Sequence, residues 1–348
     1  MIEVKNLTKR YGNHLAVSDL SFEIGEGEIY GFLGPNGAGK STTMNIMTGC
    51  LAATSGEVKI GGFDIFEDAD KAKRLIGYLP ELPPLYIDRT PWEYLTFVGR
   101  AKGLKGQELH DQIMNVCEVT KILDVVHRLI KNLSKGYRQR VGIAQALLGD
   151  PKVIILDEPT VGLDPRQIIE IRDLIRSLGE THTVILSSHI LSEVQAICTR
   201  IMIISDGKLV ACDTPENLER LFAGNVTIDL TVEAAQSDVA AILEGLPVES
   251  AEYAEPSEEG RCSVTLSAAS DAADELCRGI FYACAKADKP ILQLATNRAT
   301  LESIFIELTG AGSDDPDYIP PEQRLDEAEP ENAEQTEERS EEKEAAEE

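Results

Sequence analysis

A glycine-rich segment at residues 34–41 carries the strongest chemical signal in this sequence, because it can cradle phosphate groups. It follows an apolar, strand-like run and precedes a stretch compatible with a helix from Lys40 to about residue 48. Its glycines allow a tight turn whose backbone N–H groups point inward, and the helix N-terminus adds positive dipole. We expect Lys40 to reach the β- and γ-phosphates of a nucleotide and the Ser41 hydroxyl to bind Mg²⁺. The predicted phosphate-binding residues are Gly34, Pro35, Asn36, Gly37, Ala38, Gly39, Lys40, Ser41 and Thr42.

Two adjacent carboxylates, Asp157 and Glu158, end a continuous apolar run at residues 153–156. Such a run is typical of a strand buried on both faces. Successive side chains of a strand point to opposite faces of the sheet, so the two acids cannot have the same role. Asp157 fits a Mg²⁺ contact beside Ser41, direct or through water, and Glu158 is positioned to polarise an attacking water as general base. The alternative is that the two acids simply end a strand and are solvated. The glycine-rich phosphate segment upstream makes this alternative the less favoured interpretation.

A second anion site is indicated at residues 133–140, where Ser134 and Gly136 precede a helical run at 141–148. A hydroxyl, backbone N–H groups and a helix dipole together can hold an anion. Taken alone, this segment favours the alternative that Ser134 acts as a simple N-cap.

The elements around these residues indicate an α/β protein with a mostly parallel sheet. Strands and helices alternate between residues 152 and 204, as crossover connections require. Earlier strands are expected near residues 2–33, 56–60 and 74–79. A capping box at Thr90–Glu93, with Pro91 at the first helical position, opens a helical insert of about residues 82–148. We assign residues 1–224 to this first domain.

A second unit at residues 225–310 has the pattern of a small α+β domain. Strands are expected at 226–232, 261–266 and 290–294, and helices at 235–244, 270–286 and 300–309. Residues 311–348 hold 16 acidic and 3 basic side chains, a net charge of −13, within a total of −27. Few apolar residues accompany them, so we predict a disordered acidic tail.

The overall composition excludes several classes of protein. No basic face for sequence-independent nucleic-acid binding is evident. Seven dispersed cysteines without a C-x-x-C spacing indicate reduced thiols in a cytosolic protein, not a disulfide framework or zinc site. No signal peptide or membrane-spanning apolar run is found, so the chain is not expected to cross a membrane unaided.

The order and spacing of these elements resemble the nucleotide-binding subunit of an ATP-binding cassette (ABC) transporter, over residues 1 to about 222. The resemblance implies a P-loop NTPase cassette that binds ATP and Mg²⁺. It includes Gly162-Leu163-Asp164, similar to the D-loop of the family, and His189, similar to its switch histidine. It implies that His189 contacts the γ-phosphate, with a helix-start histidine as the alternative. It also implies that Tyr11 stacks on adenine, with simple packing as the alternative.

Two motifs depart from the family pattern. Glu81 stands where most members have glutamine; a carboxylate can still bind Mg²⁺, but its charge could alter the water geometry and the coupling to a membrane partner. The signature reads Leu-Ser-Lys-Gly-Tyr at 133–137, so Lys135 and Tyr137 are substitutions. Both departures resemble a subgroup of ABC-2-type exporter ATPases, including gliding-motility and drug-resistance subunits, which often carry a C-terminal appendage.

The resemblance also implies partners. Ser134 and Gly136 would complete the phosphate loop of a second ATPase subunit, an identical or homologous chain, in a head-to-tail dimer. A separate integral-membrane permease would dock on the helical insert, which places the chain in the cytoplasm on the inner face of the membrane. The alternatives are a soluble ABC ATPase acting on the ribosome or nucleic acid and a non-hydrolysing regulatory module. The transported substrate is not readable from this chain.

Overall fold

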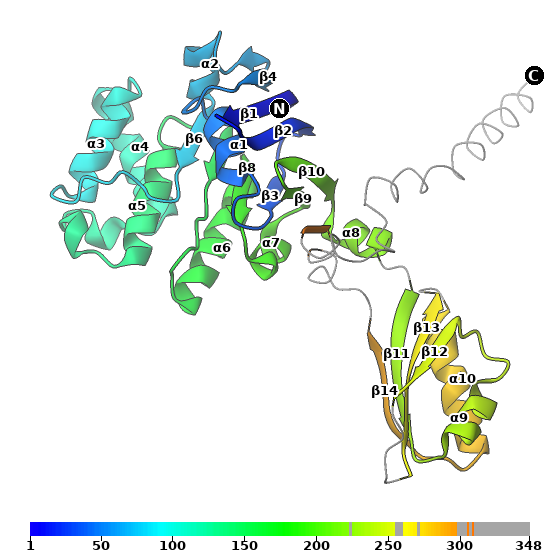
Figure 1. Cartoon of the computed structure of the whole chain (residues 1–348). Helices are drawn as coiled ribbons and strands as arrows, with labels where there is room; N and C mark the ends of the chain where they lie inside the picture. Colours follow the sequence, from blue (N-terminus) through cyan, green and yellow to red (C-terminus); the bar gives the residue numbers. More distant parts are fainter. Residues whose placement is uncertain (223–224, 255–259, 270–271, 298–304, 306–307, 310–348) are drawn as a thin grey trace, which may run out of the picture. The chain divides into compact units, whose positions relative to one another are not determined.

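The computed structural model describes residues 1–222, 225–254, 260–269, 272–297, 305 and 308–309 (Figure 1). Most of them form two compact units, one built on Met1–Cys212 and one on Asp213–Phe305. The domain boundary predicted at residue 224 and the acidic tail predicted at 311–348 lie outside the described residues. So does the helix predicted at 300–309, apart from Phe305, Leu308 and Thr309.

A six-stranded sheet forms the centre of the first unit, in the order β10-β9-β3-β8-β7-β6. The contacts of β3 with β8 and β9, and those of β7 with β6 and β8, are parallel, which confirms the predicted α/β class. β7 (Val153–Leu156) is buried throughout, as its apolar run predicted. The other strands are β3 (Ile29–Leu33), β6 (Ile76–Leu79), β8 (Thr183–Ser188), β9 (Arg200–Ser205) and β10 (Lys208–Asp213).

Helices cover both faces of this sheet. On one face α1 (Lys40–Met47) buries Met44 and Met47 in a core shared with β3 and with a second, antiparallel sheet. On the other face lie α6 (Pro165–Gly179) and α7 (Leu191–Ile197). α7 comes so close to β3 that a Cβ atom at Gly31 would lie 2.3 Å from Val194 Cγ1.

The antiparallel sheet has the order β2-β1-β4-β5 and lies above α1 in Figure 1. Its strands are β1 (Ile2–Tyr11), β2 (His14–Ile24), β4 (Ser55–Ile60) and β5 (Phe63–Asp64). α2 (Ala69–Arg74) follows β5, so the strand predicted at 74–79 begins only at Ile76. The hairpin turn between β1 and β2 brings Tyr11 opposite His14.

The helical insert comprises α3 (Pro91–Ala101), α4 (Gly106–Val119), two 3₁₀ turns, η1 (Leu123–Val125) and η2 (Ile130–Asn132), and α5 (Lys135–Leu147). The predicted capping box is present: Glu93 N donates to Thr90 Oγ1 at 3.2 Å, and Thr90 N donates to Glu93 Oε2 at 3.0 Å. α5 begins at Lys135, earlier than the predicted 141. Ser134 caps it by accepting a hydrogen bond from Tyr137 N at 3.3 Å.

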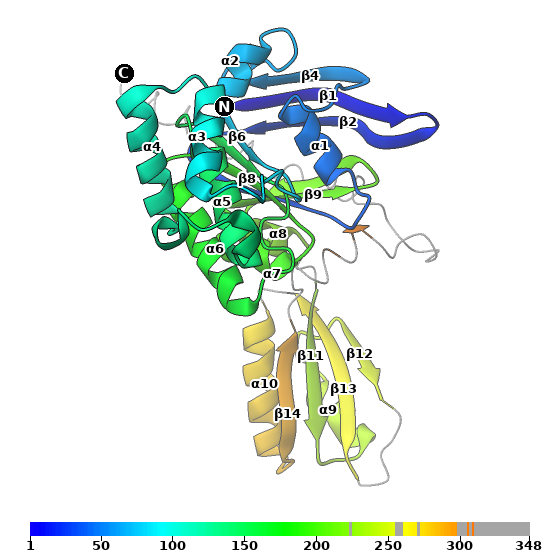
Figure 2. The ribbon, with the colours of Figure 1, turned by 90° about the vertical axis from the view of Figure 1, so that its left-hand side faces the viewer.

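The second unit has the element order β11-α9-β12-β13-α10-β14, after α8 (Pro215–Phe222). Its antiparallel sheet runs β12-β13-β11-β14, the ferredoxin-like βαββαβ arrangement. Both helices bury apolar side chains against one sheet face, and Figure 2 shows α10 running beside β14. The bounds are β11 (Asn225–Val232), α9 (Gln236–Leu243), β12 (Ser250–Tyr253), β13 (Cys262–Ala269), α10 (Ala273–Lys286) and β14 (Ile291–Asn297).

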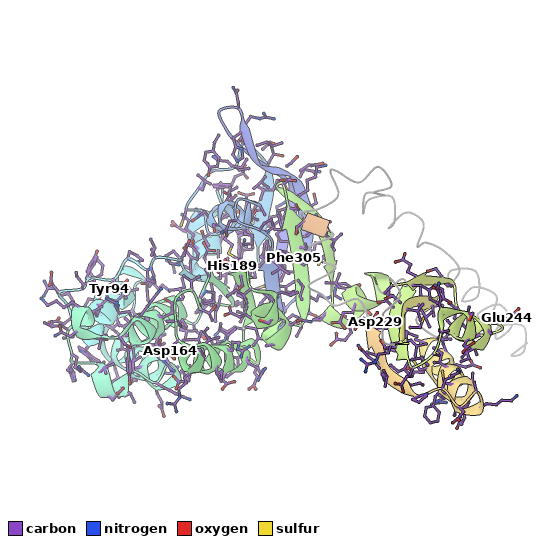
Figure 3. All side chains as sticks on the ribbon, turned by 60° about the horizontal axis from the view of Figure 1, so that its bottom comes forward. Tyr94, Asp164, His189, Asp229, Glu244 and Phe305 are labelled. Atoms are coloured by element: carbon purple, nitrogen blue, oxygen red, sulfur yellow. The ribbon has the colours of Figure 1, made fainter. Side chains whose placement is uncertain are left out.

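The other face of this sheet is polar. Asp229, labelled in Figure 3, accepts hydrogen bonds from Thr265 Oγ1 at 2.9 Å and from Asn297 Nδ2 at 2.7 Å. Sequence analysis missed β12 because a four-residue edge strand with mostly exposed side chains has no alternating pattern.

Candidate active site

The glycine-rich segment folds into a turn that leads directly into α1. Gly39 has φ 103°, a left-handed conformation that favours glycine, and a Cβ atom there would lie 2.5 Å from the Ala16 carbonyl oxygen. In this fully described segment no side chain caps the N-terminus of α1. Its first N–H groups are therefore available to phosphate oxygens, and the helix dipole favours an anion there.

Lys40 is buried at the base of this turn. Its ammonium donates to the carbonyl oxygens of Gly34 at 2.7 Å and Pro35 at 3.1 Å. Burial lowers the pKa of Lys40, and the nearby Glu158 and Asp157 carboxylates partly oppose that shift. The lysine charge is thus held inside the turn, where it can neutralise phosphate.

Asp157 and Ser41 meet at the carboxyl end of β7. Ser41 Oγ donates to Asp157 Oδ1 at 3.2 Å, and Ser187 Oγ donates to the same oxygen at 2.6 Å. Ser187 also accepts a hydrogen bond from Glu158 N at 2.8 Å. The parallel pairing of β7 with β8 therefore lets one fully buried hydroxyl hold the Asp157 carboxylate and the Glu158 backbone.

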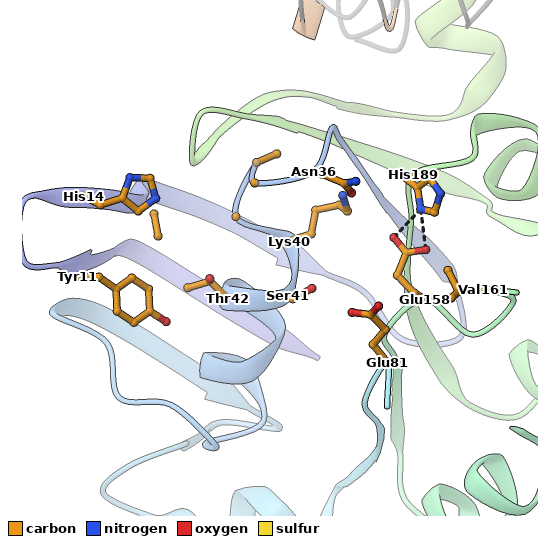
Figure 4. A pocket seen from close by; sticks show the side chains of 14 residues that line it. Tyr11, His14, Asn36, Lys40, Ser41, Thr42, Glu81, Glu158, Val161 and His189 are labelled. Carbon is orange, nitrogen blue, oxygen red and sulfur yellow. Dashed lines mark hydrogen bonds and ion pairs between the residues drawn. The ribbon is translucent and has the colours of Figure 1, made fainter. Parts of the chain in front are cut away.

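Glu158 is aimed by an unusual backbone conformation. Its φ is 49°, a left-handed value that is uncommon for residues other than glycine. Its carboxylate oxygens lie 2.9 and 3.1 Å from His189 Nδ1, as the dashed lines in Figure 4 show. Backbone strain of this kind is concentrated at functional sites.

Lys40, Ser41, Glu158 and His189 line one cavity of about 360 Å³, whereas Asp157 lies behind Ser41 and is not among the lining residues. Figure 4 shows Glu81 between Ser41 and Glu158, and Tyr11 and His14 at the other end. Tyr11 is 47% exposed, and Lys9 Nζ lies over its ring, 5.0 Å from the ring centroid. The lining residues are Tyr11, His14, Ala16, Asn36, Gly37, Ala38, Gly39, Lys40, Ser41, Thr42, Glu81, Glu158, Val161 and His189.

Sequence analysis missed three lining residues, His14, Ala16 and Val161, and the buried Ser187. His14 enters the cavity because it pairs with Tyr11 across a hairpin, and the Gly12-Asn13 turn was the available signal. Ser187 contacts Asp157 and Glu158 only because β8 pairs with β7, and no local sequence pattern predicts that pairing.

The structure does not bring Ser134 and Gly136 to this cavity. They line a separate one of about 560 Å³ with Asp164, and no residue lines both cavities. Asp164, labelled with His189 in Figure 3, caps α6 by accepting hydrogen bonds from Arg166 N at 3.1 Å and Gln167 N at 3.0 Å. The described chain therefore holds the predicted site residues around two separate cavities.

The two unusual signature residues contact other parts of the same chain. Tyr137 donates its hydroxyl hydrogen to Asp124 Oδ2 at 2.9 Å, and that bond raises the pKa of Tyr137. Lys135 extends over Gly162, where a Cβ atom would lie 2.2 Å from Lys135 Nζ. Gly162 has φ 66°, and this left-handed backbone favours glycine.

Comparisons with known proteins agree with this geometry. Residues 17–161 match the family model described as ABC transporter. An uncharacterized ABC transporter ATP-binding protein of Bacillus subtilis, YhcH, is 44% identical over 60% of this chain and 68% of its own length. The linearmycin resistance ATP-binding protein LnrL of the same organism is 38% identical, over 67% of this chain and 75% of its own length.

Solved structures also resemble the first unit. The dimeric, post-hydrolysis ATP-binding cassette MJ0796, bound to ADP and Pi, superposes with a TM-score of 0.56 at 28% identity, covering 62% of this chain and 98% of that one.

Proposed function

This chain belongs to the ABC transporter ATP-binding proteins, and from that membership we propose that it hydrolyses ATP as one of two paired subunits to power a separate export permease. The observation that carries the proposal is the single cavity in which Glu158 and His189 face the phosphate turn of Lys40 and Ser41. Such an arrangement suits transfer of a phosphoryl group to water.

In this proposal Glu158 acts as the general base. Its carboxylate is nearly buried, its direction is fixed by the Ser187 bond to its N–H, and it faces the cavity. It takes the proton of the water that attacks the γ-phosphorus, and the bond to the β-phosphate oxygen breaks. His189 orients the carboxylate and contacts the γ-phosphate, while Lys40 neutralises charge that develops on the phosphates.

The residues present also fit Mg²⁺. Ser41 Oγ and Asp157 Oδ1, two oxygen atoms that can bind a metal ion, lie 3.2 Å apart, and Glu81 adds a carboxylate to the cavity that Ser41 lines. Mg²⁺ binds proteins through one or two such groups, with water and phosphate oxygens completing its shell. When bound, Mg²⁺ would offset charge on the β- and γ-phosphates.

The second cavity, which Ser134 and Gly136 line apart from the phosphate turn, is the reason for proposing a pair of subunits. Ser134 and Gly136 lie at the N-terminus of α5, where N–H groups and the dipole favour the γ-phosphate of a partner's ATP. ATP then joins two chains, and loss of its γ-phosphate releases them. Tyr11 is proposed to stack on adenine and Asp164 to contact ATP across that interface.

The helical insert is proposed to bind the permease. It exposes large apolar side chains that a monomer does not need at its surface, namely Leu82, Tyr86 and Phe97, which are 85, 51 and 53% exposed. No helix of the described chain is both long and apolar enough to cross a membrane. The chain is thus proposed to act at the cytoplasmic face of the membrane, with Asp213–Phe305 as an accessory domain.

Export is favoured by the name of LnrL, a resistance protein. No observation favours action on the ribosome or nucleic acid. The test is purification of the tagged chain from its own cells in mild detergent, followed by mass spectrometry. We expect a stoichiometric integral-membrane protein that restores ATP-dependent transport in vesicles. Recovery of ribosomes or nucleic acid, without a membrane protein, would contradict the proposal.

A further inference from the structure

Glu193 is a buried acidic residue that the proposed mechanism does not use. It lies in the first turn of α7 and is only 6% exposed. In the described part of the chain no cation pairs with its carboxylate, and His189, four residues earlier, lies against Glu158 instead. Burial of a carboxylate without a cation is unfavourable unless hydrogen bonds replace the lost water. The groups that bond to this carboxylate therefore show what it holds.

Two buried hydroxyl groups donate to the same carboxylate oxygen. Thr160 Oγ1 lies 2.5 Å from Glu193 Oε2, a short distance of the kind that charged acceptors give. Ser188 Oγ lies 3.4 Å from the same oxygen and also accepts a hydrogen bond from Ile190 N at 3.0 Å. Glu193 thus joins the turn that follows β7 to the end of β8.

Each of these two segments carries a side chain of the candidate active site. Glu158 lies two residues before Thr160, and His189 directly follows β8. Neither Glu158 nor Thr160 belongs to a helix or strand, and the turn between them is closed by Val161 N, which donates to the Glu158 carbonyl oxygen at 3.3 Å. Because Glu158 has a strained φ of 49°, its backbone depends on outside contacts to stay in place. The bond from Thr160 to Glu193 is such a contact.

A local role in α7 does not account for this arrangement. An acidic side chain in the first turn of a helix interacts favourably with the helix dipole, and an exposed one does so as well. That role requires neither the burial of Glu193 nor its bond to Thr160, which is 33 residues away in the sequence. The long-range bond therefore points to a role outside the helix.

We propose that Glu193 is a positioning residue for ATP hydrolysis. Through its two hydroxyl partners it holds the turn of Glu158 against the segment of His189, the two side chains that face each other in Figure 4. The inference rests on the proposed function, because it names the residue that places the general base. Glu193 is not among the residues that line the phosphate cavity. Its contacts should thus affect kcat and leave the affinity for ATP unchanged.

Variants of Thr160 test this role without removing the buried charge. Thr160→Val has nearly the same shape but cannot donate to Glu193, whereas Thr160→Ser keeps the hydroxyl. A misplacement of about 1 Å costs about 100-fold in rate, so a shift of about half that size corresponds to about tenfold. We expect Thr160→Val to lower kcat by about tenfold with an unchanged Kd for a non-hydrolysable ATP analogue. Thr160→Ser should recover most of the lost rate.

The measurements are steady-state hydrolysis and calorimetry with the full chain, purified with the membrane protein that the proposed function requires. Thr183→Val is the matched control, because Thr183 is equally buried at the other end of β8 and its Oγ1 accepts a hydrogen bond from Gly27 N at 3.0 Å. It should lower the urea midpoint as Thr160→Val does and keep the kcat of the parent. Glu193→Met and Thr160→Val act on one contact, so their combination should lower kcat no further than the more affected single variant.

The outcomes separate this inference from the proposed function. A parent kcat in Thr160→Val would overturn the inference, and so would equal losses of kcat in Thr160→Val and Thr160→Ser. A loss of kcat in Thr183→Val as large as that in Thr160→Val would also overturn it, because the effect would then be one of stability alone. The Thr160 pair decides the question even if Glu193→Met does not fold. A parent complex that hydrolyses no ATP would instead remove the proposed function, and this inference with it.

Discussion

Replacing Ser187 by alanine removes the one hydroxyl that ties the two acidic residues of the candidate site together. Its Oγ donates to Asp157 Oδ1 at 2.6 Å and accepts from Glu158 N at 2.8 Å, and the side chain is fully buried. Alanine leaves the Glu158 N–H without a partner. It also removes one hydrogen-bond donor from the carboxylate of Asp157, a residue that is 3% exposed.

The expected cost follows from those two bonds. A hydrogen bond to a charged group contributes about 1.5–3 kcal/mol, and a buried N–H left without a partner costs about 1–3 kcal/mol. Partial relaxation makes a total of about 2–4 kcal/mol the expected loss in the free energy of unfolding. Glu158 also loses the bond that fixes its strained backbone, and a displacement of about 1 Å lowers a rate by about 100-fold. We expect kcat for ATP to fall by about 10- to 100-fold.

Urea unfolding and steady-state ATP hydrolysis measure the two effects in the same preparation. The control is Ser177→Ala, because Ser177 Oγ donates only within α6, to the Leu174 carbonyl oxygen at 2.7 Å. That variant should lose about 0.5–1.5 kcal/mol and keep its kcat. If Ser187→Ala retained both the stability and the kcat of the parent chain, the account of how Asp157 and Glu158 are held would be wrong.

Two further outcomes are expected. Lys40→Ala should weaken ATP binding by about 100-fold or more, because a buried charge within reach of the phosphates is lost; unchanged affinity by calorimetry would count against the phosphate turn. Gly162→Ala should lower the free energy of unfolding by about 1–2 kcal/mol through its left-handed backbone, about as much as Gly12→Ala, which has a similar φ, because the flexible end of Lys135 can move away from a Cβ atom. A loss well above that of Gly12→Ala in urea unfolding would contradict this reasoning.

The parts of the site that the sequence could predict are those set by local chemistry. Lys40, Ser41 and Asp157 were found because a phosphate turn needs glycines beside a strand and a helix, and because a doubly buried strand has a continuous apolar run. The structure places these side chains within one network, and their catalytic and binding roles stay predictions. The α/β class followed from the same alternation and is confirmed.

The parts of the site that the sequence did not predict depend on pairing between segments that are distant in the sequence. Ser187 acts through the register of β8 against β7, and His14 through a hairpin. α5 begins at Lys135 because Ser134 caps it, although Gly136 in its first turn lowers helix propensity. No sequence pattern showed that Tyr137 reaches Asp124 or that Lys135 covers Gly162. Such contacts exist only after the insert has packed against the sheet.

The measurement that tests the central claim most directly is the mass of the Glu158→Gln variant in solution with ATP and Mg²⁺. Glutamine keeps the shape of the side chain but cannot accept the proton of water, so bound ATP persists and should hold two chains together. Light scattering should give twice the 38.0 kDa of one chain, and Ser134→Arg in the same background should return the single-chain mass. A variant that binds ATP and yet stays at 38.0 kDa would contradict the claim that two chains complete the site.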